Sequence, residues 1–527
     1  MSNTAQSAAS TRIASLLDAN SFVEIGGQIT ARSTDFNLSA KETPSDGVIT
    51  GYGVIDGSLV YVYSQDATVL NGTVGEMHAK KIARLYDFAM KTGAPVIGLI
   101  DCAGMRLQEA TDALNGFGEI YMQQTKASGV IPQITGIFGT CGGGMAMIPA
   151  LTDFTLMEEK KAKLFVNSPN AIEGNEISKC DTSAAEYQAK EAGLVDFKGS
   201  EEDVLAQIRA LVTMLPANNE DDMSYEECTD DLNRVCKDLA NCAGDTSIAL
   251  SQISDNNVFF EVKADYAKDM VCGFIKLNGS TVGAVANRTE IYDAEGNLTE
   301  TMDAVLSARG ARKAADFVKF CDAFNIPVLT LTNVTGFKAT KCSEANMAKA
   351  VAELTYAFAD ATVPKVNVIV GKAYGSAYLA MNSKSIGADM VYAWPNAEIG
   401  MMDAKLAAKI MYADSDAATI NEKAAEYATL QSSVESAARR GYVDTIIEAE
   451  DTRKYVIGAF EMLYTKREDR PSKKHGTLKY LFRSRCPSVQ AKNTEQYNEV
   501  SINEAEMEKN CQSDAGYNLC IFSDSLR

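Results

Sequence analysis

Residues 81–104, KIARLYDFAMKTGAPVIGLIDCAG, and residues 313–336, KAADFVKFCDAFNIPVLTLTNVTG, align without a gap at an offset of 232 positions. In each segment an amphipathic run precedes a short apolar run that begins after a proline, which predicts a helix followed by a buried strand. The same register continues as far as Gly143 in the first segment and Gly375 in the second. A repeat of this length indicates two copies of one domain.

Two further segments, VITGYGVIDGSLVYVYSQD (48–66) and MVCGFIKLNGSTVGAVANR (270–288), extend the duplication toward the N-terminus. Each surrounds an Asp-Gly (56–57) or Asn-Gly (278–279) dipeptide, which is typical of tight β-hairpins. Each copy therefore predicts a hairpin, then helices and buried strands in alternation, then a turn of small residues that begins a helix. This order indicates an α/β fold with a largely parallel sheet.

The repeat assigns residues 11–225 and 246–487 to two domains. We assign the segment between them, 226–245, to a linker, because LPANNEDDMSYEECTDD, which leads into it, is acidic and rich in turn-forming residues. Residues 488–527 are polar, include NTEQYNEVSINEAEMEKN and have no counterpart in the repeat. We expect a peripheral or partly disordered tail there.

Composition limits the possible partners. The 527 residues carry a net charge of −20, which argues against nucleic acid as a partner, because such proteins present a basic face. The 12 cysteines form no CxxC pair and no metal-binding spacing, so we expect a reducing cytoplasm and no metal. The N-terminus lacks an apolar signal region, and no run reaches the ~18 apolar residues of a membrane span, so we expect no direct membrane insertion.

Three consecutive glycines interrupt an apolar run in GTCGGGMA (139–146), and GKAYGSAY (371–378) occupies the matching place in the second copy. In both, a buried strand ends in small residues and a helix begins, so unpaired backbone N–H groups point outward from the helix N-terminus. Close packing of helix on strand is the simpler explanation. Because the pattern occurs in both copies, we favour two anion holes, which implies that two oxyanions develop.

The chain resembles the carboxyltransferase subunits of biotin-dependent acyl-CoA carboxylases, transcarboxylases and sodium-pumping decarboxylases over about residues 11–480. The segments that carry the resemblance include LLDANSFVEIG, SQDATVLNGTVGE, GTCGGGMAMIPALTDF, FFEVKADYA, KAYGSAYLAM, GADMVYAWPNAEIG and RPSKKHG. The resemblance is to the propionyl-CoA carboxylase β and methylmalonyl-CoA decarboxylase α type. It implies two tandem domains of the crotonase-like α/β fold, which belongs to the ClpP/crotonase superfamily.

By this resemblance, Gly143 and Gly144 form the hole for the thioester enolate of an acyl-CoA, and Ser376 and Ala377, with Gly375 beside them, hold the ureido oxygen of biotin. Each hole stabilises the negative charge of one reaction partner while CO2 passes between them. In the carboxylation direction the resemblance implies that the biotin ureidate itself takes the α-proton, so no protein base is needed. The expected substrate-binding positions around the holes are Gly142, Ala103, Gly104, Tyr374 and, at the rim, Arg106.

The resemblance also implies partners. Biotin is attached to a separate biotin carboxyl carrier protein, and the complex includes either biotin carboxylase or the membrane β subunit of a decarboxylase. The chain forms a homo-hexamer, a trimer of dimers, in which copy one of one chain and copy two of another build each site. The chain has no P-loop, GxxxxGK[ST], so an ATP site would lie on a partner.

Several residues invite other readings. AMKT (89–92) resembles a biotinyl-lysine sequence, but Lys91 ends a predicted amphipathic helix, whereas a carrier lysine lies at a hairpin tip. His78 and His475 lack a catalytic motif, and we expect structural roles for both. Glu76 and Asp66 are ambiguous between a structural and an acidic role. Lysines that could meet the CoA phosphates, although lysines are usually solvated, are Lys80, Lys81, Lys160, Lys161 and Lys163.

The sequence departs from the family pattern in three places. The longer basic helix with which many relatives begin is missing from this sequence. Ser376 replaces the second glycine of AYGG, which leaves the backbone N–H in place. In MMDAKLAAK (401–409), Asp403 and Leu406 replace two glycines of the family's V-M-G-x-E-G-A pattern and Lys405 its acid. This bulk could change the acyl pocket or a subunit interface.

Two other functions stay open at this point. A noncatalytic scaffold of a biotin-dependent complex would explain the departures at 401–409, although the glycine turns are intact in both copies. A crotonase-like hydratase or isomerase would need a pair of carboxylates over the first hole, and the sequence shows no clear pair. Within the leading hypothesis, both the acyl group and the direction of carboxyl transfer are open.

Overall fold

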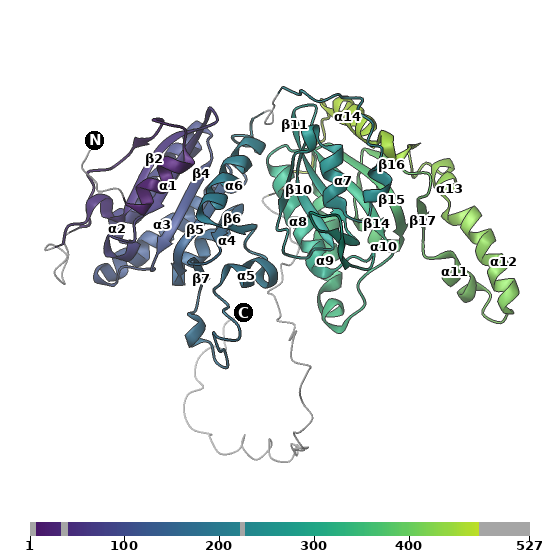
Figure 1. Ribbon diagram of the computed structural model, residues 1–527, viewed down its shortest axis with the longest axis horizontal. Helices are drawn as coiled ribbons and strands as arrows, with labels where there is room; N and C mark the ends of the chain where they lie inside the picture. The colour runs from purple at the N-terminus through teal and green to yellow at the C-terminus, as the bar shows by residue number, and fades with distance from the viewer. Residues whose placement is uncertain (1–6, 33–40, 222–226, 474–527) are drawn as a thin grey trace, which may run out of the picture. The chain divides into compact units, whose positions relative to one another are not determined.

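The computed structural model of the chain describes residues 7–32, 41–221 and 227–473. The polar tail predicted at 488–527 and His475 lie outside the described residues. Two large sheets, each covered by helices, account for most of the described chain (Figure 1).

The first sheet has the strand order β1-β2-β3-β4-β5-β6-β8, and β7 pairs with β5. β1, β2 and β3 are antiparallel, whereas β3 to β8 pair in parallel. The strands are β1 (Val23–Glu24), β2 (Val48–Ile55), β3 (Ser58–Gln65), β4 (Val96–Cys102), β5 (Gln133–Gly142), β6 (Phe154–Glu158), β7 (Lys163–Phe165) and β8 (Phe197–Gly199).

The second sheet repeats this order, as β9-β10-β11-β14-β15-β16-β18 with β17 paired to β15. A separate hairpin, β12 (Glu290–Tyr292) and β13 (Leu298–Thr301), lies outside this sheet. The strands of the sheet are β9 (Phe259–Val262), β10 (Met270–Leu277), β11 (Ser280–Asn287), β14 (Val328–Val334), β15 (Lys365–Tyr374), β16 (Met390–Ala393), β17 (Glu398–Gly400) and β18 (Thr445–Ile446). The two sheets therefore have the same strand order, as the predicted duplication requires.

Turn chemistry explains the two hairpins. Asp56 (φ 48°) and Gly57 (φ 83°) join β2 to β3, and Asn278 (φ 50°) and Gly279 (φ 77°) join β10 to β11. Positive φ at both central residues gives the turn whose twist matches that of the flanking strands, and Asn, Asp and Gly tolerate it best. Both predicted hairpins are confirmed.

Register within the two copies matches residue for residue. β5 pairs first with β6, at 134–137, and then with β7, at 140–142. β15 does the same with β16, at 366–369, and β17, at 372–374. Both pairs of ranges differ by the offset of 232 that the sequence shows. In each copy the strand that leads into the glycine turn therefore pairs with its neighbours in the same register.

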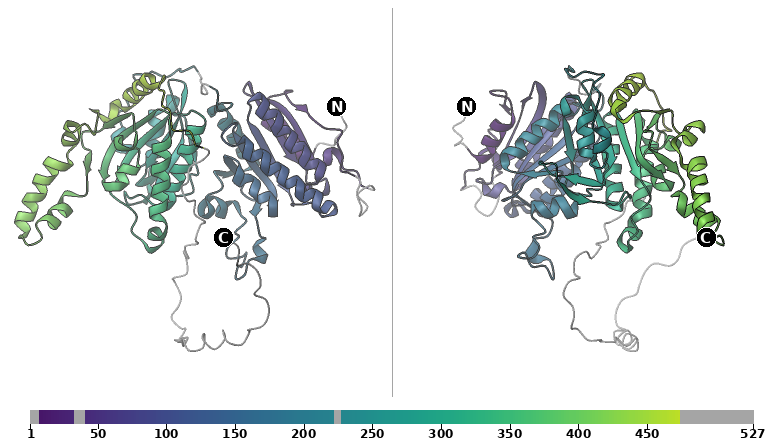
Figure 2. Two further views of the ribbon diagram at one scale, coloured as in Figure 1. Left: turned by 180° about the vertical axis from the view of Figure 1, so that it is seen from behind. Right: turned by 45° about the vertical axis from the view of Figure 1, so that its right-hand side comes forward.

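Helices cover both faces of each sheet. In the first copy α1 packs against α6 on one face and α2 against α3 on the other, and Figure 2 shows the α2 and α3 face from behind. The helices of the first copy are α1 (Ala8–Leu16), α2 (Glu76–Thr92), α3 (Ala110–Ala127), α4 (Met147–Leu151), α5 (Ala185–Tyr187) and α6 (Glu201–Met214). α2 ends at Gly93, which adopts a left-handed conformation (φ 64°) and donates its N–H to the carbonyl of Ala89.

The helices of the second copy follow the same plan. α8 takes the place of α2, α9 that of α3 and α14 that of α6. Their bounds are α7 (Thr246–Ile253), α8 (Ala308–Ala323), α9 (Lys341–Asp360), α10 (Gly375–Ala380), α11 (Ala404–Met411), α12 (Ala417–Tyr427), α13 (Val434–Arg439) and α14 (Thr452–Leu463). α11 and α12 form a hairpin that extends away from the second sheet (Figure 1). Within the described ranges, no helix combines the length and the hydrophobicity that a membrane span requires.

Side chains of successive strand residues enter different cores. Val62 and Leu99 pack in the cluster on the α1 and α6 side, whereas their neighbours Tyr63 and Ile100 pack on the α2 and α3 side. Because side chains alternate across a strand, a strand that is apolar throughout is buried on both faces. This confirms the prediction of buried strands made from the apolar runs.

The described part of the predicted linker is held by specific contacts. Arg234 donates to the carboxylate of Asp230 at 2.9 Å and to the carbonyls of Gln252 at 2.9 Å and Ser254 at 2.8 Å. These bonds attach the segment to α7 and to the turn after it. The domain boundaries at 11–225 and 246–487 stay predictions.

We predict that Gly98→Ala destabilises the first domain. A Cβ at Gly98, in the middle of β4, would lie 2.3 Å from the hydroxyl oxygen of the buried Tyr63, and overpacking of this kind costs about 1–3 kcal/mol. Thermal denaturation should show a melting temperature lowered by roughly 2–8 °C. The control is Gly118→Ala, an exposed position in α3 where a Cβ meets nothing within 4 Å. Equal melting temperatures for Gly98→Ala and the parent chain would contradict the prediction.

Candidate active site

The first glycine turn forms where β5 ends. Gly142 closes the strand and a short 3-10 helix, η5 (Gly143–Ala146), begins at once. Gly143 has φ 62°, a conformation that favours glycine, and a Cβ placed there would meet nothing within 4 Å. Among the described residues, no side chain caps the start of the helix. The first N–H groups of the turn therefore lie at an open, uncapped helix start.

The second turn has nearly the same backbone. Tyr374 closes β15 with φ −114° and ψ 137°, and Gly142 closes β5 with φ −114° and ψ 153°. Gly375 begins α10 with φ 59°, and Ser376 and Ala377 continue its first turn. Again no side chain of the described part of the chain caps the helix start. The resemblance between the two sequence patterns is thus a resemblance in conformation.

Two of the expected substrate-binding residues lie beside the first turn. Cys102 at the end of β4 is the register partner of Cys141 in β5. Gly104 follows with φ 111°, and a Cβ on it would lie 3.4 Å from the carbonyl oxygen of Gly142. Ala103 precedes it, so the structure brings Ala103, Gly104 and Gly142 together at the carboxyl end of the sheet.

Arg106 does not lie at a rim, contrary to the expectation from sequence. Its side chain is buried, with 1% of the residue exposed. One guanidinium nitrogen lies 2.6 Å from Asp46 and 2.8 Å from Glu109, and the other donates to the carbonyl of Thr73 at 2.8 Å. A guanidinium that is buried and bonded in this way holds the loop after β4 in place and is not free to bind a phosphate.

His78 belongs to the same buried group and is structural, as predicted. Its Nδ1 lies 2.9 Å from the carbonyl oxygen of Asp46, and its Nε2 lies 3.1 Å from the side-chain nitrogen of Gln65. This arrangement fits a neutral ring that donates from Nδ1 and accepts at Nε2. Burial, followed by the nearby Arg106 charge, lowers the pKa of His78 well below its usual range. The ring is therefore neutral at physiological pH.

Lys81 is also removed from the candidates for CoA binding. Its ammonium group donates to the carbonyl and hydroxyl oxygens of Ser45, at 2.9 and 2.7 Å, and to the carbonyl of Val48. Burial lowers its pKa to about 8, although the Glu24 and Asp46 carboxylates oppose this shift. Lys81 fixes the segment that precedes β2.

The other candidate lysines differ in availability. Lys80 lies 2.6 Å from Glu76, and Lys163 lies 2.7 Å from Asp181, so both are already in ion pairs. Lys160 and Lys161 are exposed in the turn between β6 and β7, and Lys160 lies 3.7 Å from Glu159. Lys91 lies in the last turn of α2, as predicted, and not at a hairpin tip.

The two ambiguous carboxylates have local partners. Glu76 lies in the first turn of α2 and pairs with Lys80 and with Arg32, at 2.8 Å. Asp66 accepts from the backbone N–H of Thr68 at 3.0 Å. Both therefore stabilise helix or turn structure.

Tyr374 carries a side chain where the first copy has Gly142. Its hydroxyl is hydrogen-bonded to the carboxylate of Glu398 in β17, and Lys372 lies 5.8 Å from the centre of its ring. Burial, together with Glu398, raises the pKa of Tyr374. The second turn is therefore bordered by a protonated phenol that the first turn lacks.

No sequence motif indicated a role for Tyr121. This residue lies in α3, and its hydroxyl donates to the carbonyl oxygen of Gly144 at 2.6 Å. The contact joins positions 23 residues apart, from a helix to a turn, and no local sequence pattern encodes such a contact.

The departure at 401–409 has a local explanation. Asp403 accepts a hydrogen bond from the backbone N–H of Leu406 at 3.0 Å and caps α11. Leu406 and Met401 are exposed in the single chain. The carbonyl oxygen of Met401 lies 3.1 Å from the position that a Cβ on Gly375 would take, so the backbone of this segment borders the second turn.

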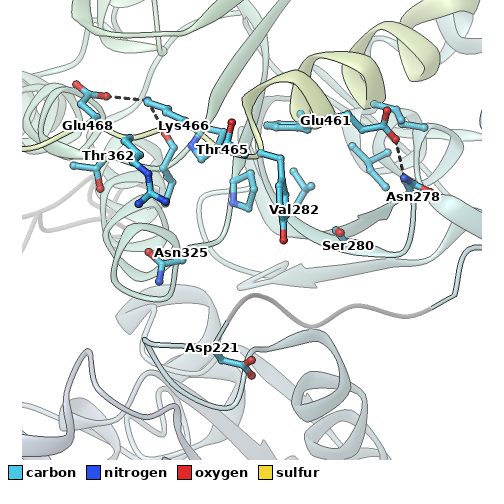
Figure 3. Close-up of a pocket in the computed structure, with 18 of the residues that line it drawn as sticks. Asp221, Asn278, Ser280, Val282, Asn325, Thr362, Glu461, Thr465, Lys466 and Glu468 are labelled. Atoms are coloured by element: carbon cyan, nitrogen blue, oxygen red, sulfur yellow. Dashed lines mark hydrogen bonds and ion pairs between the residues drawn. The ribbon is translucent and has the colours of Figure 1, made fainter.

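A groove of about 1140 Å³ lies elsewhere, near the start of β11, β14 and β15 (Figure 3). It includes Pro364, whereas the second turn follows Tyr374 at the other end of β15, roughly 30 Å along a ten-residue strand. Its Lys466 is paired with Asp389 at 2.8 Å and with Glu468 at 2.9 Å. The groove is therefore separate from the second glycine turn.

We predict an acid-sensitive contribution of His78 to stability. The unfolded ring takes up a proton near its usual pKa of about 6.5, whereas the folded ring stays neutral, so acidification favours the unfolded chain. Below about pH 6.5 the free energy of unfolding should fall by up to about 1.4 kcal/mol per pH unit from this residue. Urea denaturation between about pH 5 and 7.5 measures it.

His78→Gln is the comparison, because an amide side chain can donate to Asp46 and accept from Gln65 without titrating. The stability difference between the two proteins should shrink or reverse on acidification. A difference that stays constant with pH would show that the folded ring takes up a proton.

Comparison with known proteins shows the family to which the chain belongs. The carboxyl transferase domain family matches residues 3–478. The methylmalonyl-CoA decarboxylase α subunit of Veillonella parvula is 41% identical over 482 residues, 89% of this chain and 92% of that protein. The propionyl-CoA carboxylase β chain of Roseobacter denitrificans is 40% identical over the same shares of the two chains.

A solved structure agrees. The transcarboxylase 12S structure, described as a hexamer with hydrolysed methylmalonyl-coenzyme A bound, superposes with a TM-score of 0.84 at 37% identity, covering 89% of this chain and 92% of that chain. This match and the repeated strand order confirm the predicted fold of two tandem crotonase-like domains. The chain belongs to the carboxyl transferase family, and it is a carboxyltransferase of the type found in propionyl-CoA carboxylase β chains and methylmalonyl-CoA decarboxylase α subunits.

Proposed function

We propose that the chain moves a carboxyl group between an acyl-CoA thioester and biotin attached to a separate carrier protein. The observation that carries this proposal is the pair of glycine turns at Gly143 and Gly375, which share backbone geometry and lack side-chain caps. The reaction develops negative charge on two different oxygens, one on each partner. Two equivalent N–H sites on one chain suit two such charges.

The residues of each turn would act through their backbone. Gly143 and Gly144 would donate N–H groups to the thioester oxygen as the enolate forms. Ser376 and Ala377, beside Gly375, would donate to the ureido oxygen of biotin. Biotin supplies the nitrogen that accepts or gives up the carboxyl group. Removal of one donor from such a hole typically costs about 3 kcal/mol of transition-state stabilisation.

The first turn does not need a protein base in this scheme. His78, the one histidine in the described part of the chain, is buried, neutral and bonded on both ring nitrogens. A mechanism in which the chain stabilises charge and biotin handles the proton is consistent with this arrangement.

The similar proteins suggest which substrates and partners to consider. The names of the similar proteins refer to methylmalonyl-CoA and propionyl-CoA, and their identities to this chain, 41% and 40%, do not separate decarboxylation from carboxylation. We therefore propose an α subunit of an acyl-CoA decarboxylase or a β subunit of an acyl-CoA carboxylase. The carrier protein, with biotin carboxylase or a membrane β subunit, would complete the complex. A homo-hexamer in the cytoplasm is the proposed assembly.

Substrate identity can be tested directly. The purified chain is incubated with free biotin and, in turn, malonyl-CoA, methylmalonyl-CoA and glutaconyl-CoA, and decarboxylated product is followed by mass spectrometry. Biotin-dependent turnover is expected with at least one thioester, and the fastest identifies the acyl group. Carrier binding by an assembled chain that turns over none of them would favour the noncatalytic scaffold, which the replacements at 401–409 motivate.

We predict that loss of a single backbone donor slows the reaction strongly. Gly144→Pro in the first turn and Ser376→Pro in the second each remove one N–H group. Each should lower kcat by about 10²–10³-fold. Ser376→Ala keeps the N–H, and its loss should be at least about tenfold smaller than that of Ser376→Pro. Equal losses for Ser376→Ala and Ser376→Pro would contradict a backbone role at that position. Circular dichroism and the oligomeric state control for folding.

A further inference from the structure

The side chain of Tyr121 contacts the first turn at Gly144. The tyrosine hydroxyl donates to the Gly144 carbonyl oxygen at 2.6 Å, and the tyrosine ring packs against Phe117 with 5.9 Å between ring centres. Partial burial raises the pKa of Tyr121, so the hydroxyl keeps the proton that it donates. The donor is therefore carried by α3, a helix of 18 residues, and not by the turn itself.

The turn needs an external contact of this kind. Gly142, Gly143 and Gly144 have no Cβ, and glycine samples more backbone conformations than any other residue. The backbone N–H of Met147 is directed to the same Gly144 carbonyl. The peptide group that follows Gly144 is planar, so two donors on its carbonyl oxygen fix its orientation and limit rotation about the Cα–C bond of Gly144.

Resting on the proposed function, we propose that Tyr121 is a positioning residue of the first anion hole. Its hydroxyl holds the Gly144 carbonyl, limits rotation about the Cα–C bond of Gly144 and thereby keeps the Gly144 N–H directed at the thioester oxygen.

The second copy shows why the contact is confined to the first. The offset of 232 puts Glu353 at the position of Tyr121 and Ser376 at that of Gly144. Glu353 is paired with Arg312 at 3.5 Å. Ser376 and Ala377 carry Cβ atoms, which restrict the backbone of the second turn without an added hydrogen bond. The hydrogen bond from a tyrosine hydroxyl is found at the turn that has three glycines.

Tyr121→Phe tests the proposal, because it removes the hydroxyl and keeps the ring. The kcat of biotin-dependent decarboxylation should fall about three- to tenfold, the range expected for one hydrogen bond, while KM for the acyl-CoA stays unchanged. The dissociation constant of S-propyl-CoA, a thioether without the carbonyl oxygen, should also stay unchanged. A general distortion of the pocket would weaken binding of both the acyl-CoA and S-propyl-CoA.

The matched control is Tyr86→Phe. The Tyr86 hydroxyl is buried and accepts a bond from the side chain of Gln124, also in α3, at 3.4 Å. This variant removes a tyrosine hydroxyl from the same helix interface without touching the turn. Its kcat should match that of the parent chain.

Amide hydrogen exchange gives a second measurement that does not require turnover. The peptide covering residues 139–147 should exchange faster in Tyr121→Phe than in the parent chain or in Tyr86→Phe, because the turn has lost one of its restraints.

The outcomes separate the two proposals. Parent-like kcat and exchange in Tyr121→Phe would overturn the role of Tyr121 and leave the carboxyl-transfer proposal intact. Weaker S-propyl-CoA binding in proportion to kcat would also overturn it. If the parent chain turns over no thioester, the proposed function fails, and exchange at 139–147 alone decides whether Tyr121 restrains the turn.

Discussion

Backbone N–H groups at a helix start are the feature on which the proposed chemistry depends. They can face outward only if the chain leaves a buried strand and begins a helix within one residue. Gly143 and Gly375 achieve this with φ near 60°, a region that a residue with a Cβ rarely adopts. The rest of each domain serves to hold that residue at the carboxyl end of a parallel sheet, beside the strands that flank it.

Duplication lets one fold provide two such turns with different surroundings. β5 and β15 pair with their neighbours in the same register, so both turns arise from the same strand geometry. The side chains around them differ. The first turn has glycine at 142–144 and is contacted by Tyr121, whereas Tyr374 and Ser376 stand at two of the matching positions of the second. In the proposed function, the common backbone would stabilise an oxyanion at each turn, and the differing side chains would select the partner that carries it.

Sequence reasoning succeeded where the determining forces are local. The Asp-Gly and Asn-Gly hairpins and the buried strands follow from neighbouring residues, and the repeat follows from the alignment. It failed for Arg106 and Lys81, because the fate of a cation depends on residues distant in sequence. Arg106 pairs with Asp46, which is 60 positions away in the sequence. Lys81 donates to Ser45, which is 36 positions away. A buried cation is stable only when paired or hydrogen-bonded, and sequence pattern does not reveal the partner.

The helical hairpin of α11 and α12 raises a related physical question. α11 has eight residues and α12 has 11, and no residue of α12 is buried within the single chain. Helices of this length are marginal on their own in water and owe their stability to packing. Asp403 caps α11, but Leu406, Ile410 and Met411 remain exposed, so a cap alone supplies little of what the hairpin needs. Contacts from other chains would supply the remainder in the proposed hexamer. The segment of greatest departure from the family pattern would then owe its stability to assembly, while its backbone at Met401 borders the second turn.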